Sequence, residues 1–344
     1  MISLSSRNWY RFTLLLIGFL IGSFVIKYFI SIEKETLFSR GRFVGILETT
    51  IPKEKETLFK LYDGVETFVM FIGYPRSSHS LLAAILDAHP EIIIPNEYDV
   101  IEHWEKYRSS RLTEKNMQKY VLFDDLHQHS MKQAMFGIRA GNNTSLTTGY
   151  HYNIPGLWQG GYQRRIKVIG DKKGDKTALD LTSSMRVLEE INQVAQVPMK
   201  FIHVTRNPFD NISTMMLLAT ESRDTVREEG VKINKSTELE RAIKNYFQMA
   251  ASNQRVRERY GDAVIDIPGH ETVIRPKETL QRLCDHLGVT CSEDYFEKCS
   301  RILYGAPSVA RDKVVWTEEQ KARVTKMTKN YTFLKDYSFD EYPN

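Results

Sequence analysis

The sequence has few cysteines, little net charge, and neither internal repeats nor low-complexity segments. Its three cysteines, Cys284, Cys291 and Cys299, lie close together. No Cys-x-x-Cys pair or histidine at ligand spacing accompanies them, so a zinc site is disfavoured. In an oxidising compartment two of them could form one disulfide, which would leave one thiol over. The formal net charge of +4 over 344 residues is too small to indicate nucleic-acid binding, but it allows a basic pocket for an anionic ligand.

Charged residues are also missing from one N-terminal stretch. Residues 12–26, FTLLLIGFLIGSFVI, carry no charge, and the apolar character continues to Ile32. A stretch of about 20 such residues is long enough to cross a membrane. Arg7 and Arg11 precede it, which favours a cytosolic N-terminus. A cleaved signal peptide is the alternative, but no small-x-small cleavage site follows the apolar run.

The rest of the chain is therefore predicted to lie in the lumen of the secretory pathway. We expect a cytosolic tail at 1–11, a signal-anchor transmembrane helix at 12–32, a charged stem at 33–64 and a single folded domain at 65–344. Asn-x-Ser/Thr sequons agree with a lumenal domain, because such acceptors are glycosylated only there. The sequons are at Asn142, Asn143, Asn211, Asn234 and Asn330.

From residue 67 onward the pattern is that of an α/β domain. Short apolar runs rich in β-forming residues recur, and most are followed by a turn and a stretch with helical spacing. The runs are FVMFI at 68–72, KVIG at 167–170, KFIHV at 200–204 and AVIDI at 263–267. This alternation predicts a central parallel sheet covered by helices, one of them from Pro276 to just before Gly288. Residues 96–163 are less regular and are expected to shape the site of a second substrate.

The first predicted turn, GYPRSSHSLL at 73–82, lacks the Gly-Lys pair of a nucleoside-triphosphate loop, which disfavours kinase or ATPase chemistry. The strand ends at Gly73, and the helix is expected to begin near His79 or Ser80. A turn between a strand and a helix N-terminus presents free N–H groups and the positive end of the helix dipole. The serine hydroxyls and Arg76 add further donors, so the turn is a candidate phosphate site. The simpler alternative is that a serine only caps the helix.

This turn resembles the 5′-phosphosulfate loop of the sulfotransferases, P-[RK]-S-G-T-[TS]-x-L. These enzymes transfer a sulfuryl group from 3′-phosphoadenosine 5′-phosphosulfate (PAPS). The matching residues are Pro75, Arg76, Ser77, Ser80 and Leu82. The chain departs from the family at Ser78 and His79, where Gly-Thr is usual. Ser78 removes the freest backbone position of the loop, and His79 replaces a hydroxyl with an imidazole.

A second segment resembles the family's site for the 3′-phosphate, the group that distinguishes PAPS from ATP. In KFIHVTRNPFDNISTMM at 200–216, Arg206 follows a strand and Thr214 stands eight residues later, where the family usually has serine. The adjacent Ser213 is the alternative hydroxyl. Arginine suits a phosphate because its guanidinium is a rigid fork of donors. Taken alone, Arg206 could instead be a strand-edge arginine paired with Asp210.

The resemblance extends over residues 67–338 and implies a P-loop-like, three-layer α/β fold. The segment SRILYGAPSVARDKVVWTEEQ at 300–320 resembles the loop that closes over the nucleotide, where Trp316 is expected to be a packing anchor. The donor-binding site that the resemblance implies consists of Pro75, Arg76, Ser77, Ser78, His79, Ser80, Arg206, Ser213, Thr214, Arg311 and Lys313. Asn211 lies inside the second motif, so its sequon is expected to be buried and unused.

Sulfuryl transfer requires a base for the acceptor proton, cations that stabilise charge on the transferring group, and alignment of the two substrates. Glu97 follows Arg76 by 21 residues, a spacing similar to that of the catalytic glutamate of protein-tyrosine sulfotransferases, so it is the candidate base. An ordinary loop carboxylate is the alternative. Lys172, in VIGDKKGD, resembles the lysine of the family's G-[DE]-K-[TS]-P pattern and would stabilise the sulfuryl group. Arg76 would act on the leaving-group side.

We therefore predict a Golgi, single-pass type II membrane sulfotransferase that uses PAPS and needs no metal. The accepting group would be a hydroxyl, or alternatively an amine, of a glycan, a protein or a small hydroxylated molecule, with carbohydrate favoured and nucleic acid not expected. Two alternatives stay open at this point. One is a phosphotransferase on the same fold, and the other is a non-catalytic lumenal PAPS-binding protein.

Overall fold

The computed structural model of the protein describes residues 60–108, 115–137, 152–220, 231–303 and 307–340. Residues from Lys60 onward form one compact unit. The predicted tail, membrane segment and nearly all of the stem lie outside the described residues. Among the described helices, none has the length and apolar character that a membrane span requires.

A five-stranded sheet forms the centre of this unit, and every strand pair in it is parallel. The strand order is β2-β3-β1-β4-β5. The strands are β1 (Thr67–Gly73), β2 (Ile92–Ile93), β3 (Val168–Gly174), β4 (Met199–Thr205) and β5 (Val264–Pro268). All of β1 is buried, as expected for a strand covered on both faces. The prediction of an α/β fold with a central parallel sheet is confirmed.

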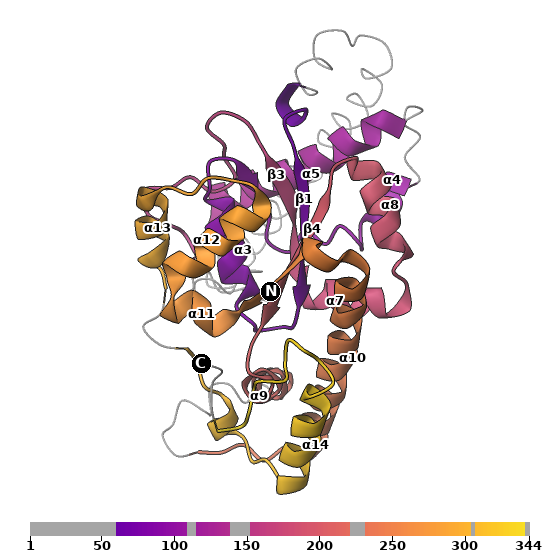
Figure 1. Ribbon diagram of the computed structural model, residues 1–344, viewed down its shortest axis with the longest axis vertical. Helices are drawn as coiled ribbons and strands as arrows, with labels where there is room; N and C mark the ends of the chain where they lie inside the picture. The colour runs from indigo at the N-terminus through magenta and orange to yellow at the C-terminus, as the bar shows by residue number, and fades with distance from the viewer. Residues whose placement is uncertain (1–59, 109–114, 138–151, 221–230, 304–306, 341–344) are drawn as a thin grey trace, which may run out of the picture. The chain divides into compact units, whose positions relative to one another are not determined.

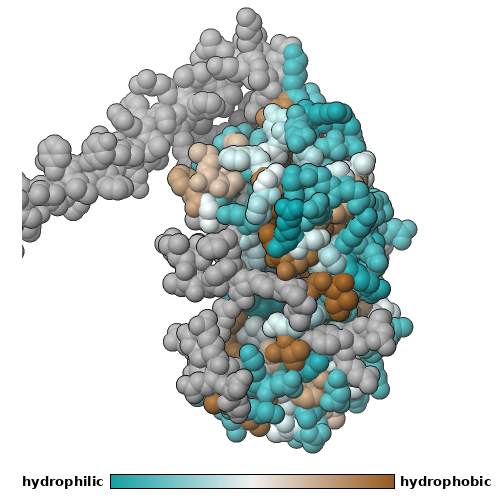
Figure 2. Space-filling model, turned by 90° about the vertical axis from the view of Figure 1, so that its left-hand side faces the viewer, coloured by the Kyte–Doolittle hydropathy of each residue, from teal (hydrophilic) through white to brown (hydrophobic). Residues whose placement is uncertain are grey.

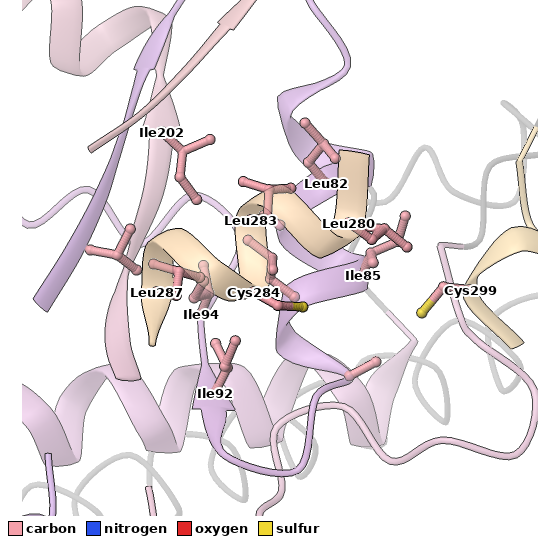
Figure 3. Packing of buried hydrophobic residues seen from close by; sticks show 14 of the residues in the cluster. Leu82, Ile85, Ile92, Ile94, Ile202, Leu280, Leu283, Cys284, Leu287 and Cys299 are labelled. Atoms are coloured by element: carbon pink, nitrogen blue, oxygen red, sulfur yellow. The ribbon is translucent and has the colours of Figure 1, made fainter. Parts of the chain in front are cut away.

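One face of the sheet is covered by α3 (His79–Asp87), α11 (Gly269–Ile274), α12 (Pro276–Leu287) and α13 (Glu293–Ser300) (Figure 1). Figure 3 shows apolar side chains of α12 and α3, among them Leu283 and Leu82, gathered with Ile202 of the sheet in one cluster. Pro276 is the first residue of α12, and Gly288 ends it with a φ of 74°, as the sequence predicts. The solvent side of these helices is mostly hydrophilic, with scattered apolar patches (Figure 2).

The opposite face is covered by α5 (Lys115–Phe136), α7 (Asp175–Ser183), α8 (Arg186–Ala195) and α10 (Ser236–Tyr260), with the short α4 (Trp104–Arg108) against α5. Two further helices, α9 (Pro208–Ala219) and α14 (Glu318–Thr328), lie beyond the carboxyl ends of the strands (Figure 1). They share a second apolar cluster with α10, in which Trp316 packs against Phe209 at 5.4 Å between ring centroids. Short 3₁₀ turns, η2 (Gly261–Ala263) and η3 (Arg311–Lys313), precede β5 and α14.

Two helices differ from the sequence prediction. The region 96–163, which was expected to be irregular, contains the 22-residue helix α5. A separate helix, α7, begins directly at the end of β3, in a segment for which the sequence pattern named no particular helix. The buried side of α5 includes His127, Ser130 and Gln133. These polar residues interrupt the apolar periodicity from which an amphipathic helix is predicted.

The cysteines form one disulfide and leave one thiol, as the sequence analysis allowed. Cys284 of α12 is bonded to Cys291, with a Cα–Cα distance of 6.2 Å, and Cys299 is a buried free thiol. The bond ties the end of α12 to the start of α13.

Candidate active site

The turns that follow β1 and β4 begin side by side, because the two strands pair in parallel up to Gly73 and Val204. Gly73 has a φ of 141°, and a Cβ at this position would lie 2.7 Å from the carbonyl oxygen of Val204. Only glycine therefore lets β1 end so close to β4. Both candidate phosphate motifs are thus delivered to the same edge of the sheet, the edge at which parallel α/β sheets bind ligands.

The turn after β1 is shaped as an anion cradle. The hydroxyl of Ser77 is buried and donates to the carbonyl of Tyr74 at 2.8 Å, which tightens the turn before α3. Among the described residues, the backbone N–H groups of Ser78, His79 and Ser80 have no backbone acceptor, because they stand at the first turn of α3. With the helix dipole, these donors suit a phosphate or phosphosulfate group.

Two residues of the cradle have strained backbones. Arg76 has a φ of 64° and Ser78 a φ of 76°, the left-handed region that favours glycine. Ser78 stands where the resembling family has glycine, so the chain keeps the loop's shape with a residue that adopts it at a cost. The side chain of Arg76 is exposed, and its guanidinium makes no hydrogen bond or ion pair with the part of the chain that the structure describes.

His79 contributes to the cradle through its backbone rather than its ring. Its imidazole is buried, 3.3 Å from the hydroxyl of Ser77 and against Gly174, where an added Cβ would lie 2.8 Å from the ring. Burial, together with the charge of Lys172, lowers the pKa of His79 to about 3. The ring is therefore neutral at physiological pH and fills the space between α3 and the end of β3.

Lys172, Glu97 and Ser80 meet beside this cradle. The ammonium of Lys172 is fully buried and donates to Glu97 Oε1 at 2.6 Å and to the hydroxyl of Ser80 at 2.8 Å. Lys173 donates to the other carboxylate oxygen, Oε2, at 2.9 Å. Burial lowers the pKa of Lys172, although the carboxylate of Glu97 acts in the opposite direction. Burial alone would raise the pKa of Glu97, but the two lysines outweigh it and lower the pKa to about 2.

The second motif has the geometry that the spacing of eight residues predicts. The guanidinium of Arg206 donates to the hydroxyl of Thr214 at 3.1 Å and to the carbonyl of Arg76 at 3.1 Å. It also donates to the carbonyl of Ser308, in the late loop, at 2.8 Å. Arg206 thus joins the cradle, α9 and the late loop at one point. The other hydroxyl, that of Ser213, is buried and accepts a hydrogen bond from Trp316 Nε1 at 3.1 Å.

Asp210 holds the late loop to α9. Its carboxylate is fully buried and accepts from the N–H groups of Ala310 and Arg311 and from the guanidinium of Arg311 at 3.1 Å. Lys313 lies two residues further on and is exposed. Asn211 is also buried, and its amide donates to the carbonyl of Pro75 at 2.6 Å, which fixes α9 against the cradle.

The structure therefore brings most of the predicted site residues to one edge of the sheet. The carbonyl contact between Arg206 and Arg76 joins the two motifs, and the Ser80–Lys172–Glu97 contacts join the candidate base to the cradle. Sequence reasoning missed the roles of Asp210 and Asn211 as anchors. It also did not predict that Lys173 would help to hold Glu97, although Lys173 is the neighbour of Lys172 in the sequence.

An anion cradle at a strand-to-helix turn, a second basic site beside it and a carboxylate held by two lysines form a site suited to a ligand with two anionic groups. The profile of the sulfotransferase family matches residues 69–293, more than half of the 344 residues. The chain belongs to the sulfotransferase family, which confirms the predictions of family and enzyme class. PAPS is the sulfuryl donor of this family, so the prediction of the co-substrate is confirmed at this level.

Solved structures similar to the chain include the sulfotransferase STF9 from Mycobacterium avium. That protein is 13% identical with a TM-score of 0.43, over 82% of this chain and 80% of its own. The mouse sulfotransferase SULT7A1, solved in complex with PAP, is 14% identical with a TM-score of 0.39, over 79% of this chain and 88% of its own. The sulfotransferase domain of the Synechococcus PCC 7002 olefin synthase is 16% identical with a TM-score of 0.39, over 67% of this chain and 76% of its own. Comparison with curated proteins gives no match.

Proposed function

We propose that the protein transfers the sulfuryl group of PAPS to a hydroxyl of a carbohydrate acceptor in the lumen of the Golgi, with Glu97 as the base. The observation that carries the proposal is the contact of Lys172 with both Ser80 and Glu97, at 2.8 and 2.6 Å. This contact holds Glu97 directly beside the candidate phosphosulfate cradle. Among the described residues at this edge of the sheet, Glu97 is the only carboxylate that accepts from two lysines.

Each group then has one task. The acceptor oxygen forms a bond to sulfur while the bond between sulfur and the phosphate oxygen of the donor breaks, and 3′-phosphoadenosine 5′-phosphate (PAP) leaves. Glu97 takes the acceptor proton. Lys172 stabilises the charge on the sulfuryl oxygens, and the N–H groups of the cradle with Arg76 hold the 5′-phosphate. Arg206 and Thr214 are assigned to the 3′-phosphate, because a guanidinium beside a hydroxyl matches its oxygens.

The two lysines also control the basicity of Glu97. A carboxylate with a pKa of about 2 is a weak base at neutral pH. An anionic donor group beside Lys172 would share the charge of that lysine, so the pKa of Glu97 would rise when the donor is bound. The base would then be activated only when there is a sulfuryl group to transfer.

Three features support the lumenal location and the membrane anchor. The apolar segment 12–32 follows two arginines. Cys284 and Cys291 are placed to form a disulfide, which persists in oxidising compartments. The sequon residues Asn234 and Asn330 are exposed. Carbohydrate is proposed as the acceptor because glycans are the abundant hydroxyl-bearing substrates of that compartment.

The test is a transfer assay with the full chain in detergent and radiolabelled PAPS. The acceptor panel contains glycosaminoglycan chains, tyrosine peptides and small hydroxylated molecules. We expect transfer to glycans, and we expect Glu97→Gln to lower kcat by about 100-fold or more, as for loss of a general base. Glu102→Gln is the matched control, because Glu102 is an exposed carboxylate of the same segment whose partner is Lys176.

Binding measurements separate loss of the base from loss of the fold. Glu97→Gln leaves the buried Lys172 without a carboxylate, which destabilises the protein by up to about 3 kcal/mol. Calorimetry should nevertheless show PAP bound to this variant, and PAP bound far more tightly than ATP to the wild type. Unchanged kcat in Glu97→Gln would remove Glu97 as the base, and transfer to peptides or small molecules alone would remove the carbohydrate acceptor.

A further inference from the structure

The loop that carries Glu97, residues 95–100, has an unfavourable backbone conformation that contacts with other elements must stabilise. Glu97 has a φ of 63° and Asp99 a φ of 66°, so two non-glycine residues of one short loop are left-handed. Such a conformation is unfavourable for a residue other than glycine and persists only where the surroundings impose it. β3 imposes part of this shape, because the N–H of Glu97 donates to the carbonyl of Lys172 at 2.7 Å.

A buried side chain of α5 holds the start of the loop. The amide of Gln133 accepts from the N–H of Asn96 at 2.7 Å and donates to the carbonyl of Asn96 at 2.5 Å. The side chain of Gln133 thus pairs with both the N–H and the carbonyl of Asn96, as the backbone of a neighbouring strand would. Gln133 is 5% exposed and Asn96 is 6% exposed, so water does not compete for these hydrogen bonds.

A buried carboxyl of β3 holds the end of the loop. Asp171 Oδ2 accepts from the N–H of Val100 at 2.8 Å, and Asp171 is 2% exposed. Asp171 and Lys172 are consecutive in β3, and their side chains contact two different residues of the same loop. Lys172 contacts the carboxylate of Glu97, and Asp171 contacts the backbone three residues later.

We propose that Gln133 and Asp171 are positioning residues that clamp the two ends of the loop 95–100 and so hold Glu97 beside the donor cradle. The proposal rests on the proposed role of Glu97 as the base. Among the described residues, neither side chain makes a hydrogen bond or an ion pair with the cradle; their hydrogen bonds are to the backbone of Asn96 and Val100. They act on the orientation of the carboxylate and not on the binding of PAPS.

The consequence is a selective loss of turnover when the clamp is removed. A displacement of about 1 Å from the productive geometry can lower a rate by about 100-fold, and sites whose supporting contacts are lost typically drift by that amount. We therefore expect kcat to fall while the affinity for the nucleotide stays the same.

The experiment compares Gln133→Ala, Asp171→Ala and Asp171→Asn with the wild type, as full chains in detergent. The matched control is Gln159→Ala. Gln159 is also a glutamine with 5% exposure that donates to two backbone carbonyls, those of Ala84 and Tyr152. We expect kcat to fall about tenfold or more in Gln133→Ala and Asp171→Ala, with the Kd for PAP within about twofold. Asp171→Asn keeps an acceptor for the N–H of Val100 and should stay within about threefold of the wild type.

The control variant, Gln159→Ala, shows the effect expected when a buried glutamine stabilises the fold but does not position Glu97. Gln159→Ala should lower Tm as much as Gln133→Ala does, but it should leave kcat within about twofold of the wild type. Equal losses of kcat in the two variants would overturn the proposal. So would a parallel loss of PAP affinity, or an Asp171→Asn variant as slow as Asp171→Ala.

Hydrogen exchange gives a readout that does not depend on activity. The backbone amides of residues 96–100 should exchange faster in Gln133→Ala and Asp171→Ala than in the wild type and Gln159→Ala. If the wild type binds PAP but transfers no sulfate, the proposed function fails, while this exchange pattern still decides whether the clamp exists. Unchanged exchange in both variants would overturn the clamp.

Discussion

At the scale of single residues, two residues of the donor cradle, Arg76 and Ser78, have a left-handed backbone that favours glycine. Ser78 has a φ of 76° at the N-cap of α3 and makes no side-chain capping hydrogen bond there. A left-handed conformation costs a residue other than glycine about 1–2 kcal/mol. Glycine removes that cost but adds flexibility to the unfolded chain, which offsets part of the gain.

We therefore expect Ser78→Gly to raise the free energy of unfolding by up to about 1 kcal/mol, measured by urea denaturation of the full chain. Ser184→Gly is the control, since Ser184 has an extended backbone with a φ of −158° and should be destabilised by the same change. If Ser78→Gly were destabilised as much as Ser184→Gly, the strain assigned to Ser78 would not exist.

A second prediction at this scale concerns pH. Burial raises the pKa of Asp171 from its ordinary value of 3.8 to about 7, with the charges of Asp99 and Glu97 adding to the effect and the N–H of Val100 and the charge of Lys172 opposing it. The folded state therefore holds this proton up to a higher pH than the unfolded chain does. The stability that the neutral carboxyl contributes is complete below about pH 4 and is lost as the pH rises through about 7.

Asp171→Asn removes this titration while keeping an acceptor for Val100. The free energy of unfolding of Asp171→Asn, relative to the wild type, should increase steadily between pH 4 and pH 7.5. Urea denaturation at several pH values measures the difference, and a difference that does not change with pH would contradict the raised pKa.

At the scale of elements, the strands could be predicted because their apolar runs are short and rich in β-forming residues, and β1 in addition is buried along its whole length. The runs at 68–72, 200–204 and 263–267 each lie within or overlap an observed strand. The parallel arrangement then places the ends of β1 and β4 at one edge, so the meeting of the two phosphate motifs was predictable. The helix α12 was predictable as well, from its proline and glycine ends.

The helix α5 could not be predicted because polar residues with specific partners lie on its buried side. Ser130 donates to both carboxylate oxygens of Asp87 at 2.8 Å, and Gln133 pairs with Asn96. A periodicity of apolar residues does not register such partners. For the same reason Gln133 and Asp171 could not be found as parts of the site, since their partners are backbone groups that any sequence provides.

A prediction at this scale concerns the attachment of the late loop to α9. Asp210 and Arg311 form a pair in which the side chains are 0% and 6% exposed. Removing either partner takes the opposite charge away from a buried charged group, which costs about 3 kcal/mol or more. Removing both should cost less than the sum of the single changes.

A double-mutant cycle with Asp210→Asn and Arg311→Gln tests this by urea denaturation. We expect a coupling free energy of about 1–3 kcal/mol, as for residues in one buried network. Additive effects would contradict it. The pair Arg301–Glu297, with side chains 61% and 68% exposed, is the control and should show a coupling of about 0.5 kcal/mol or less.

At the scale of the whole molecule, the proposed lumenal location makes the sequons a direct test of topology. Asn234 and Asn330 are exposed, whereas Asn211 is fully buried with its amide bonded to the carbonyl of Pro75. In a lumenal domain the two exposed asparagines accept glycans, and Asn211 does not once the fold has formed. Asn142 and Asn143 lie outside the described residues, so both are replaced by Gln in the test protein.

The full chain with Asn142 and Asn143 replaced by Gln is expressed in cells that carry out N-glycosylation. Its shift in gel mobility on glycosidase treatment should correspond to two glycans. Asn234→Gln and Asn330→Gln should each remove one, and the pair should remove both. Asn211→Gln should leave the number of glycans unchanged while it lowers Tm, because it disturbs the contact between α9 and the cradle. A protein without any glycan would contradict the lumenal placement, and with it the assignment of a Golgi acceptor. The proposed sulfuryl transfer would not be overturned, because it is argued from the contacts of Glu97, Lys172, Arg206 and the cradle and not from the compartment.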